Sequence, residues 1–175
     1  QYRSTLDFSN EALKAAQKGY KRIANGLRII KSMEFPADTI EQVDPSLNAE
    51  IQADIQGCYD GMNDDLNTAV TIASLFSLLK KINQLYTGQL TFEQLGSAGF
   101  DALKTNYISF LEDVLGLLEE FPENQDQLIK GMLALYQDFK ENRQYDKVDE
   151  IRASFKSMGL LIKDMKTRID WGYEE

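Results

Sequence analysis

The stretch "MNDDLNTAVTIASLF", residues 62–76, joins a cluster of acids to an apolar pattern with helical period. Asn67 or Thr68 is placed to cap a helix, and Asp64 and Asp65 just before it favour the positive end of the helix dipole. The same two carboxylates are ligand types for magnesium or calcium, but the spacing of an EF-hand loop is missing. We therefore predict that the stretch begins a helix and forms no metal or catalytic site.

Apolar residues recur with a helical period on both sides of this stretch. They predict helices over about 10–30, 46–62, 68–85, 100–118, 125–142 and 145–158. Ser9 or Asn10 is expected to cap the first helix, and Gly159 to stop the last. Inward-facing positions are expected at Leu13, Ala16, Tyr20, Ile23, Leu27, Ile30, Leu47, Ile51, Ile55, Cys58, Met62, Val70, Ala73, Phe76, Leu79, Ile82, Leu85, Leu103, Tyr107, Phe110, Leu111, Val114, Leu118, Leu128, Met132, Leu135, Tyr136, Phe139, Val148, Ile151 and Phe155.

The predicted fold class is all-α. Residues 1–120 form a helical bundle, and 124–175 form a small helical hairpin with a short irregular or β-like tail, "LLIKDMKTRIDWGYEE". Gly19 and Gly26 interrupt the first helix at a cost on the order of 1 kcal/mol each relative to alanine, which suggests that another backbone approaches there.

The residue content limits the chemistry available to this chain. It has no histidine and a single cysteine, Cys58, which excludes an internal disulfide and the usual Cys/His zinc frameworks. Cys58 is predicted to be a buried thiol. Without histidine there is no ordinary base for a nucleophile, and no glycine-rich phosphate loop is present, so no catalytic residue is predicted. No apolar run approaches the roughly 18 residues of a membrane span, so a cytoplasmic protein without a membrane partner is expected.

Charge is segregated along the chain. The net charge of −9 argues by itself against nucleic-acid binding, which needs clustered lysine and arginine. Between Ala12 and Met33, however, six residues are basic and none is acidic, whereas residues 34–65 carry many acids and no basic residue. This basic stripe either contacts nucleic acid or is an exposed helix face paired with the acid-rich second helix, and the sequence leaves both readings open.

Four segments in order resemble one family. Residues 1–13, "QYRSTLDFSNEAL", are similar to the His-Tyr-Arg-Ser-Pro-Leu-Asn/Asp-Phe-Ser segment that opens the helical domain of cysteinyl-tRNA synthetases, and 62–76 resemble their Met-Asp-Asp-Asp-Phe-Asn-Thr segment. Residues 111–118, "LEDVLGLL", contain the family's "VLGLL". Residues 143–164, "RQYDKVDEIRASFKSMGLLIKD", resemble the pattern Lys-Asp-Trp-Ala-x-Ala-Asp-x-x-Arg-x-x-Leu-x-x-x-Gly-Ile-x-Leu-x-Asp, and Trp171 follows at the family's spacing.

The resemblance implies the C-terminal part of such an enzyme. The His-Ile-Gly-His and Lys-Met-Ser-Lys-Ser motifs and the zinc ligands are not in this sequence. It implies a DALR-type anticodon-binding bundle followed by a small domain that reads the anticodon of cysteine tRNA. The missing catalytic domain of the same polypeptide, with ATP and zinc, would perform the cysteinylation.

The family's anticodon-reading positions fall on Lys140, Tyr145, Asp149 and Asp164. The family usually has arginine at the first and tryptophan at the second; lysine lacks arginine's planar fork, whereas tyrosine can still stack on a base. From spacing alone, Tyr145 reads as a core aromatic beside Val148 and Asp149 as a solvated helix face. Possible tRNA backbone contacts are Arg3, Lys14, Lys18, Lys21 and Arg28, of which Arg3 could equally meet the catalytic domain.

The terminal loop departs from the family. The family's "GPQGTTW" is "MKTRIDW" here, residues 165–171, without either glycine.

Two other functions remain open at this point. An acidic bundle without catalytic residues could be a protein-interaction module. A cysteine ligase of the mycothiol type shares the bundle but generally lacks the segment corresponding to residues 143–171.

Overall fold

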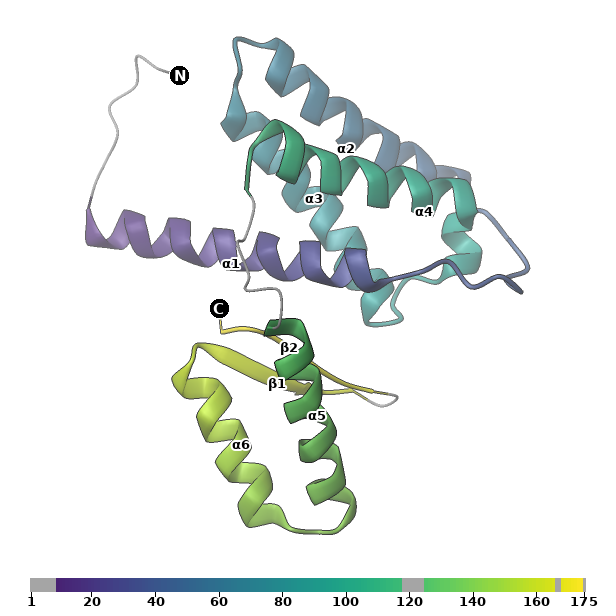
Figure 1. Cartoon of the computed structure of the whole chain (residues 1–175). Coiled ribbons are helices and arrows are strands. Elements are labelled where there is room, and N and C mark those ends of the chain that lie inside the picture. Colours follow the sequence, from purple (N-terminus) through teal and green to yellow (C-terminus); the bar gives the residue numbers. More distant parts are fainter. Residues whose placement is uncertain (1–8, 118–124, 166–167, 175) are drawn as a thin grey trace. The chain divides into compact units, whose positions relative to one another are not determined.

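The computed structural model describes residues 9–117, 125–165 and 168–174. The chain divides into two compact units, residues 1–118 and 119–175, each considered by itself (Figure 1). The first unit contains α1 (Asn10–Ser32), α2 (Pro45–Asn63), α3 (Thr68–Tyr86), α4 (Phe92–Ser109) and the π-helical turn η1 (Phe110–Val114). The second contains α5 (Gln125–Glu141), α6 (Tyr145–Ser157) and the antiparallel strands β1 (Leu160–Asp164) and β2 (Ile169–Tyr173).

Helix α1 begins as predicted, because the Ser9 hydroxyl accepts a hydrogen bond from the backbone N–H of Ala12 at 3.2 Å. Its buried residues, however, begin only at Ile23. Leu13 is 50% exposed and Tyr20 is 37% exposed, and Ala16 is also exposed. The prediction that the apolar seam is buried along the whole helix is therefore wrong for the first half of α1, whose apolar side chains are exposed.

The two helix glycines differ from expectation. A Cβ atom at Gly26 would lie 2.1 Å from Leu79 Cδ1 and 2.9 Å from the Tyr107 hydroxyl, so side chains and not a backbone approach there. A Cβ at Gly19 would meet only the Phe76 ring at 3.6 Å, which is an ordinary contact. The prediction of a close backbone at these two positions is wrong.

The opening stretch is the turn between α2 and α3, and the predicted helix start is confirmed. The Asn67 side chain accepts from the backbone N–H of Val70 at 3.3 Å. Asp65 and Leu66 adopt left-handed φ values of 50° and 54°, which close the turn within a few residues. The turn brings the backbone of α3 close to Gly61 of α2, where a Cβ atom would lie 2.8 Å from the backbone nitrogen of Thr71.

Buried polar contacts join α2 to α3. The Thr71 hydroxyl donates to the backbone carbonyl of Cys58 at 3.2 Å. Cys58 itself is fully buried, as predicted, and burial raises the pKa of its thiol to about 11, with the Asp54 carboxylate as a second cause. The thiol therefore stays protonated at neutral pH.

The predicted inward face of α3 is correct only in its second half. Leu79, Ile82 and Leu85 are buried, but Val70 is 43% exposed and Ala73 is exposed. A strict spacing of three residues advances 300° per step and drifts around a helix of 3.6 residues per turn. The buried positions of the first half are Thr71, Leu75 and Leu78.

Helix α4 begins earlier than predicted. Thr91 and Gln94 form a capping box, with hydrogen bonds of 3.4 and 3.1 Å, that starts the helix at Phe92. Gly96, with φ of 71°, kinks the helix, and the Glu41 carboxylate accepts from the Ser97 N–H at 2.9 Å just after the kink.

The end of this helical segment also differs. The π-helical turn η1 shifts the side-chain register, so Val114 is 44% exposed and not buried as predicted. Leu118 lies outside the described residues.

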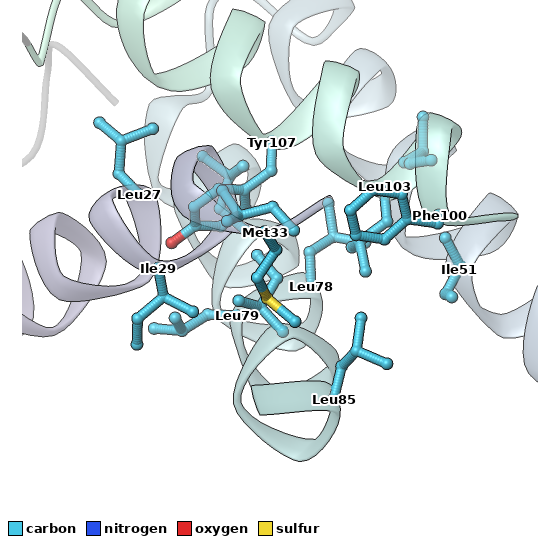
Figure 2. Packing of buried hydrophobic residues seen from close by; sticks show 14 of the residues in the cluster. Leu27, Ile29, Met33, Ile51, Leu78, Leu79, Leu85, Phe100, Leu103 and Tyr107 are labelled. Carbon is cyan, nitrogen blue, oxygen red and sulfur yellow. The ribbon is translucent and has the colours of Figure 1, made fainter. Parts of the chain in front are cut away.

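The core of the first unit contains side chains from all four helices and from η1. Figure 2 shows Leu27 and Ile29 of α1 lying near Leu79 of α3 and Tyr107 of α4. The Tyr107 hydroxyl satisfies its buried position by donating to the carbonyl of Ile23 at 3.4 Å. Other fully buried members are Ile30, Ile51, Leu75, Leu78, Ile82, Leu95, Leu103 and Leu111.

The second unit has its own small core between α5, α6 and the hairpin. The predicted β-like tail is confirmed as this hairpin, in which Ile162 pairs with Trp171. Gly159, with φ of 73°, ends the helical segment as predicted. The core consists of Ile129, Tyr136, Val148, Ile151, Phe155, Leu160 and Trp171.

The predicted face of α5 is partly wrong. Leu128 is 69% exposed, Leu135 is 49% exposed and Met132 is 36% exposed. The helix carries two adjacent apolar stripes, and the one containing Ile129 and Tyr136 faces the core.

None of the helices in the described parts of the chain is long and apolar enough to cross a membrane.

Candidate nucleic-acid interface

Three of the four predicted anticodon-reading residues lie in one charged cluster of the second unit. Lys140 is in the last turn of α5, Asp149 is in the second turn of α6, and Asp164 ends β1. The Lys140 Nζ lies 3.0 Å from one carboxylate oxygen of Asp164. Arg152, one turn after Asp149 on α6, joins the two aspartates: its Nη2 lies 2.8 Å from Asp164 and its Nη1 3.8 Å from Asp149.

A buried tyrosine completes the surroundings of Asp164. Tyr136 is fully buried, and its hydroxyl donates to Asp164 Oδ2 at 3.0 Å. The guanidinium of Arg152 lies over the Tyr136 ring, 5.5 Å from its centroid. The ring packs in the core while its hydroxyl contacts Asp164, so the core and the charged cluster share one side chain.

The contacts in the cluster shift the pKa values of Asp164 and Tyr136. Burial acts to raise the pKa of Asp164, but hydrogen bonds from Lys140 and Tyr136, together with the Lys140 charge, outweigh it and lower the pKa below its ordinary value. Burial and the hydrogen bond to Asp164 raise the pKa of Tyr136. At neutral pH Asp164 is a carboxylate and Tyr136 is a neutral donor.

Tyr145 stands apart from the core. It is the first residue of α6 and is 60% exposed, whereas Val148 is 4% exposed and packs inward. The interpretation of Tyr145 as a core aromatic beside Val148 is therefore wrong. Asp149 follows one turn later on the same side of α6, and its side chain is 76% exposed. An aromatic ring and a carboxylate are thus presented together to solvent.

The possible backbone contacts on the first unit are not equivalent. Lys14 and Lys18 are exposed on the uncovered first half of α1, one turn apart. Lys21 and Arg28 are half-buried and engaged in interactions within the protein. Arg3 lies outside the described residues. Of the basic stripe, Arg22 and Lys31 are exposed as well as Lys14 and Lys18. The Arg22 guanidinium lies 5.6 Å from the Phe76 ring centroid, and Lys31 forms an ion pair with Glu112.

Arg152 was absent from the residues predicted to form the site. Its signal in the sequence is the spacing of three from Asp149, which places an opposite charge on the same helix face. The contact with Asp164 could not be found in this way, because it depends on how the hairpin packs against α6. Across 9–117, 125–165 and 168–174, no three histidine, cysteine, aspartate or glutamate side chains are grouped to hold a metal ion.

Comparison with known proteins defines the class first. Residues 58–119, from the middle of α2 into the segment after η1, match the model of the DALR domain, so this part of the chain is a DALR domain. The whole chain is similar to cysteine–tRNA ligases. That of Cytophaga hutchinsonii is 55% identical over 174 residues, which are 99% of this chain and 35% of the relative. Those of Porphyromonas gingivalis and Bacteroides thetaiotaomicron are 34% and 32% identical over 97% of this chain and 34% of each relative.

The chain belongs to the cysteine–tRNA ligase family, in which it corresponds to the C-terminal part. It spans about a third of the length of the curated relatives it matches. Since these matches cover 97–99% of the chain, they include the small second unit as well as the bundle.

Proposed function

We propose that this chain binds cysteine tRNA and that its second unit reads the anticodon. The exposed ring of Tyr145 carries the proposal, because an aromatic side chain that is 60% exposed at a helix start is open to a partner in solution. An unpaired anticodon base offers a flat face to stack on such a ring. The similarity to cysteine–tRNA ligases supports this choice of RNA.

The charges around Tyr145 fit a splayed RNA loop. Asp149 and Asp164 are acceptors for the amino groups of guanine or cytosine, and Lys140 and Arg152 are donors for phosphates or base edges. The interleaved cations matter, because two carboxylates alone would repel the RNA backbone. Stacking and base-edge contacts carry sequence information, whereas phosphate contacts only position the RNA.

We further propose that the bundle holds the RNA outside the anticodon. Lys14 and Lys18 lie one turn apart on the uncovered half of α1, where two phosphates of an RNA stem could meet them. Arg3 is a further candidate from the family resemblance. With a net charge of −9, binding by this chain alone is expected to be weak and to fall steeply with salt.

The chemistry of cysteinylation would take place outside this chain. In the proposed parent ligase, another region of the polypeptide would use ATP and a zinc ion in the cytoplasm. The donor set of this chain does not fit the zinc, because it has no histidine and its one cysteine is buried with a raised pKa. The purified chain is therefore expected neither to exchange pyrophosphate with ATP nor to charge tRNA.

A gel-shift comparison tests the proposal. The chain is titrated into labelled cysteine tRNA and into the same tRNA with its anticodon bases exchanged, at low and at physiological salt. Tighter binding of the unaltered tRNA is expected at both salt concentrations. Equal binding of the two RNAs would refute anticodon reading by this chain.

A further inference from the structure

In the described part of the chain, Arg152 contacts both predicted base-reading aspartates. Its Nη2 hydrogen-bonds Asp164 Oδ2 at 2.8 Å, and its Nη1 lies 3.8 Å from Asp149 Oδ1. The Cζ atom of its guanidinium lies over the Tyr136 ring, 5.5 Å from the centroid. One side chain thus links α6, the end of β1 and the core tyrosine of α5.

These contacts use features that only arginine offers. Its planar fork presents separate nitrogen donors that can reach two carboxylates at once, and its flat face stacks on an aromatic ring. A lysine ammonium is a compact point charge on a flexible stem and would follow one carboxylate or the other. The Tyr136 ring in contact with Arg152 is fully buried in the core, so it fixes the position of the guanidinium.

Asp164 is held in one orientation by three donors. Lys140 contacts one of its oxygens at 3.0 Å, and Tyr136 and Arg152 both donate to the other. An ionised carboxylate has about four acceptor positions, so on the order of one remains for an incoming base. The Asp164 side chain is 28% exposed, so part of it is open to solvent.

Asp149 lacks such support from any other described side chain. It is 76% exposed, and its ion pair with Arg152 is long, at 3.8 Å. In the absence of Arg152, the two carboxylates would repel each other and would also repel a phosphate backbone. The cation between them offsets this repulsion.

We propose that Arg152 is a positioning residue for anticodon recognition, which sets the direction of Asp149 and Asp164 toward the RNA loop. This inference rests on the proposed function. Arg152 acts through the two aspartates, so its removal lowers discrimination between anticodons more than it lowers general affinity for tRNA.

The test compares three variants of the 175-residue chain. Arg152→Gln removes the charge and the fork, Arg152→Lys keeps the charge alone, and Lys156→Gln is the matched control one turn further along α6 at an exposed position. Each is titrated with the anticodon stem-loop of cysteine tRNA and with the same stem-loop carrying a changed anticodon. The ratio of the two dissociation constants is the readout, and thermal melting checks the fold.

We expect both Arg152 variants to lower this ratio on the order of tenfold, the size of one lost base-edge contact, while the control keeps the wild-type ratio. The Asp164 carboxyl, followed by NMR in the free chain, should titrate at higher pH in Arg152→Gln, because it loses a donor. A wild-type ratio in a folded Arg152→Gln protein would overturn the inference, and if that variant unfolds, Arg152→Lys decides in the same way. Equal binding of both stem-loops by the wild-type chain would instead contradict the proposed function.

Discussion

Replacing Tyr145 by alanine separates a binding role from a structural one. The side chain is 60% exposed and lies outside the core cluster of the second unit, so its removal leaves no cavity. We expect the free energy of unfolding to change by less than about 0.5 kcal/mol, as for an ordinary surface substitution. By contrast, the fully buried Tyr136 fills the core, and its truncation to alanine should cost about 3–5 kcal/mol, as for other large aromatic side chains.

The expected effect of Tyr145→Ala on binding follows from the stacking it removes. Stacking of one base on an aromatic side chain is worth about 1–3 kcal/mol, which corresponds to a rise in Kd of about 5- to 150-fold. Tyr145→Phe keeps the ring and is expected to bind within about twofold of wild type, since stacking needs no hydroxyl.

Fluorescence anisotropy with a labelled cysteine anticodon stem-loop measures both variants, and circular dichroism gives their melting temperatures. A folded Tyr145→Ala protein that binds like wild type would show that the ring stacks on no base. A marked fall in melting temperature with unchanged anticodon preference would make Tyr145 a structural residue, contrary to the reasoning above.

Three other predictions concern charge, burial and pH. Replacing Lys14 and Lys18 together by glutamine should weaken binding to all tRNAs alike and reduce the slope of log Kd against log salt concentration by about 2. The control Lys80→Gln should change neither quantity. A loss of affinity that depends on the anticodon would contradict a phosphate-binding role. Cys58 should react with a thiol reagent only when the chain unfolds, because it is buried and protonated; rapid labelling of the native chain would refute this. The pKa of Asp164 is lower in the folded chain than its unfolded value of about 3.9, so the ionised carboxylate stabilises the second unit at pH values above 3.9. This contribution is lost as the pH falls through the lower, folded pKa. Asp164→Asn should therefore remove this component from the acid unfolding curve.

Much of the fold could be predicted because its signals are local. The caps at Ser9 and Asn67, the glycine stop at Gly159 and the seam of α6 each depend on residues within one or two turns. The β-like character of the tail likewise follows from the short apolar run after Gly159. Such signals act within a few residues, so the sequence alone carries them.

Errors arose where tertiary contacts decide the outcome. The first half of α1 and the stripe containing Leu128 on α5 have the apolar period of buried helix faces, yet both are exposed. Periodicity shows that a face is apolar and cannot show which elements cover it. The turn η1 exposes Val114 for a related reason, because one extra residue in a turn rotates every later side chain.

The candidate site was predictable in part. Lys140, Tyr145, Asp149 and Asp164 came from a family resemblance. The structure links three of them, because Lys140 pairs with Asp164 and Arg152 joins Asp164 to Asp149. That link is between residues 12 apart, on a helix and at a strand end. No spacing rule for a helix or a strand reaches across such a junction, and the hydrogen bond from the buried Tyr136 was hidden for the same reason.

The most direct test of anticodon reading is an NMR titration of the chain with the cysteine anticodon stem-loop. The account predicts that the largest shift changes fall at Tyr145, Asp149 and Asp164, and that they shrink when the anticodon bases are exchanged. Changes of the same size with both stem-loops, or changes confined to residues of α1, would contradict the claim that the second unit reads the anticodon.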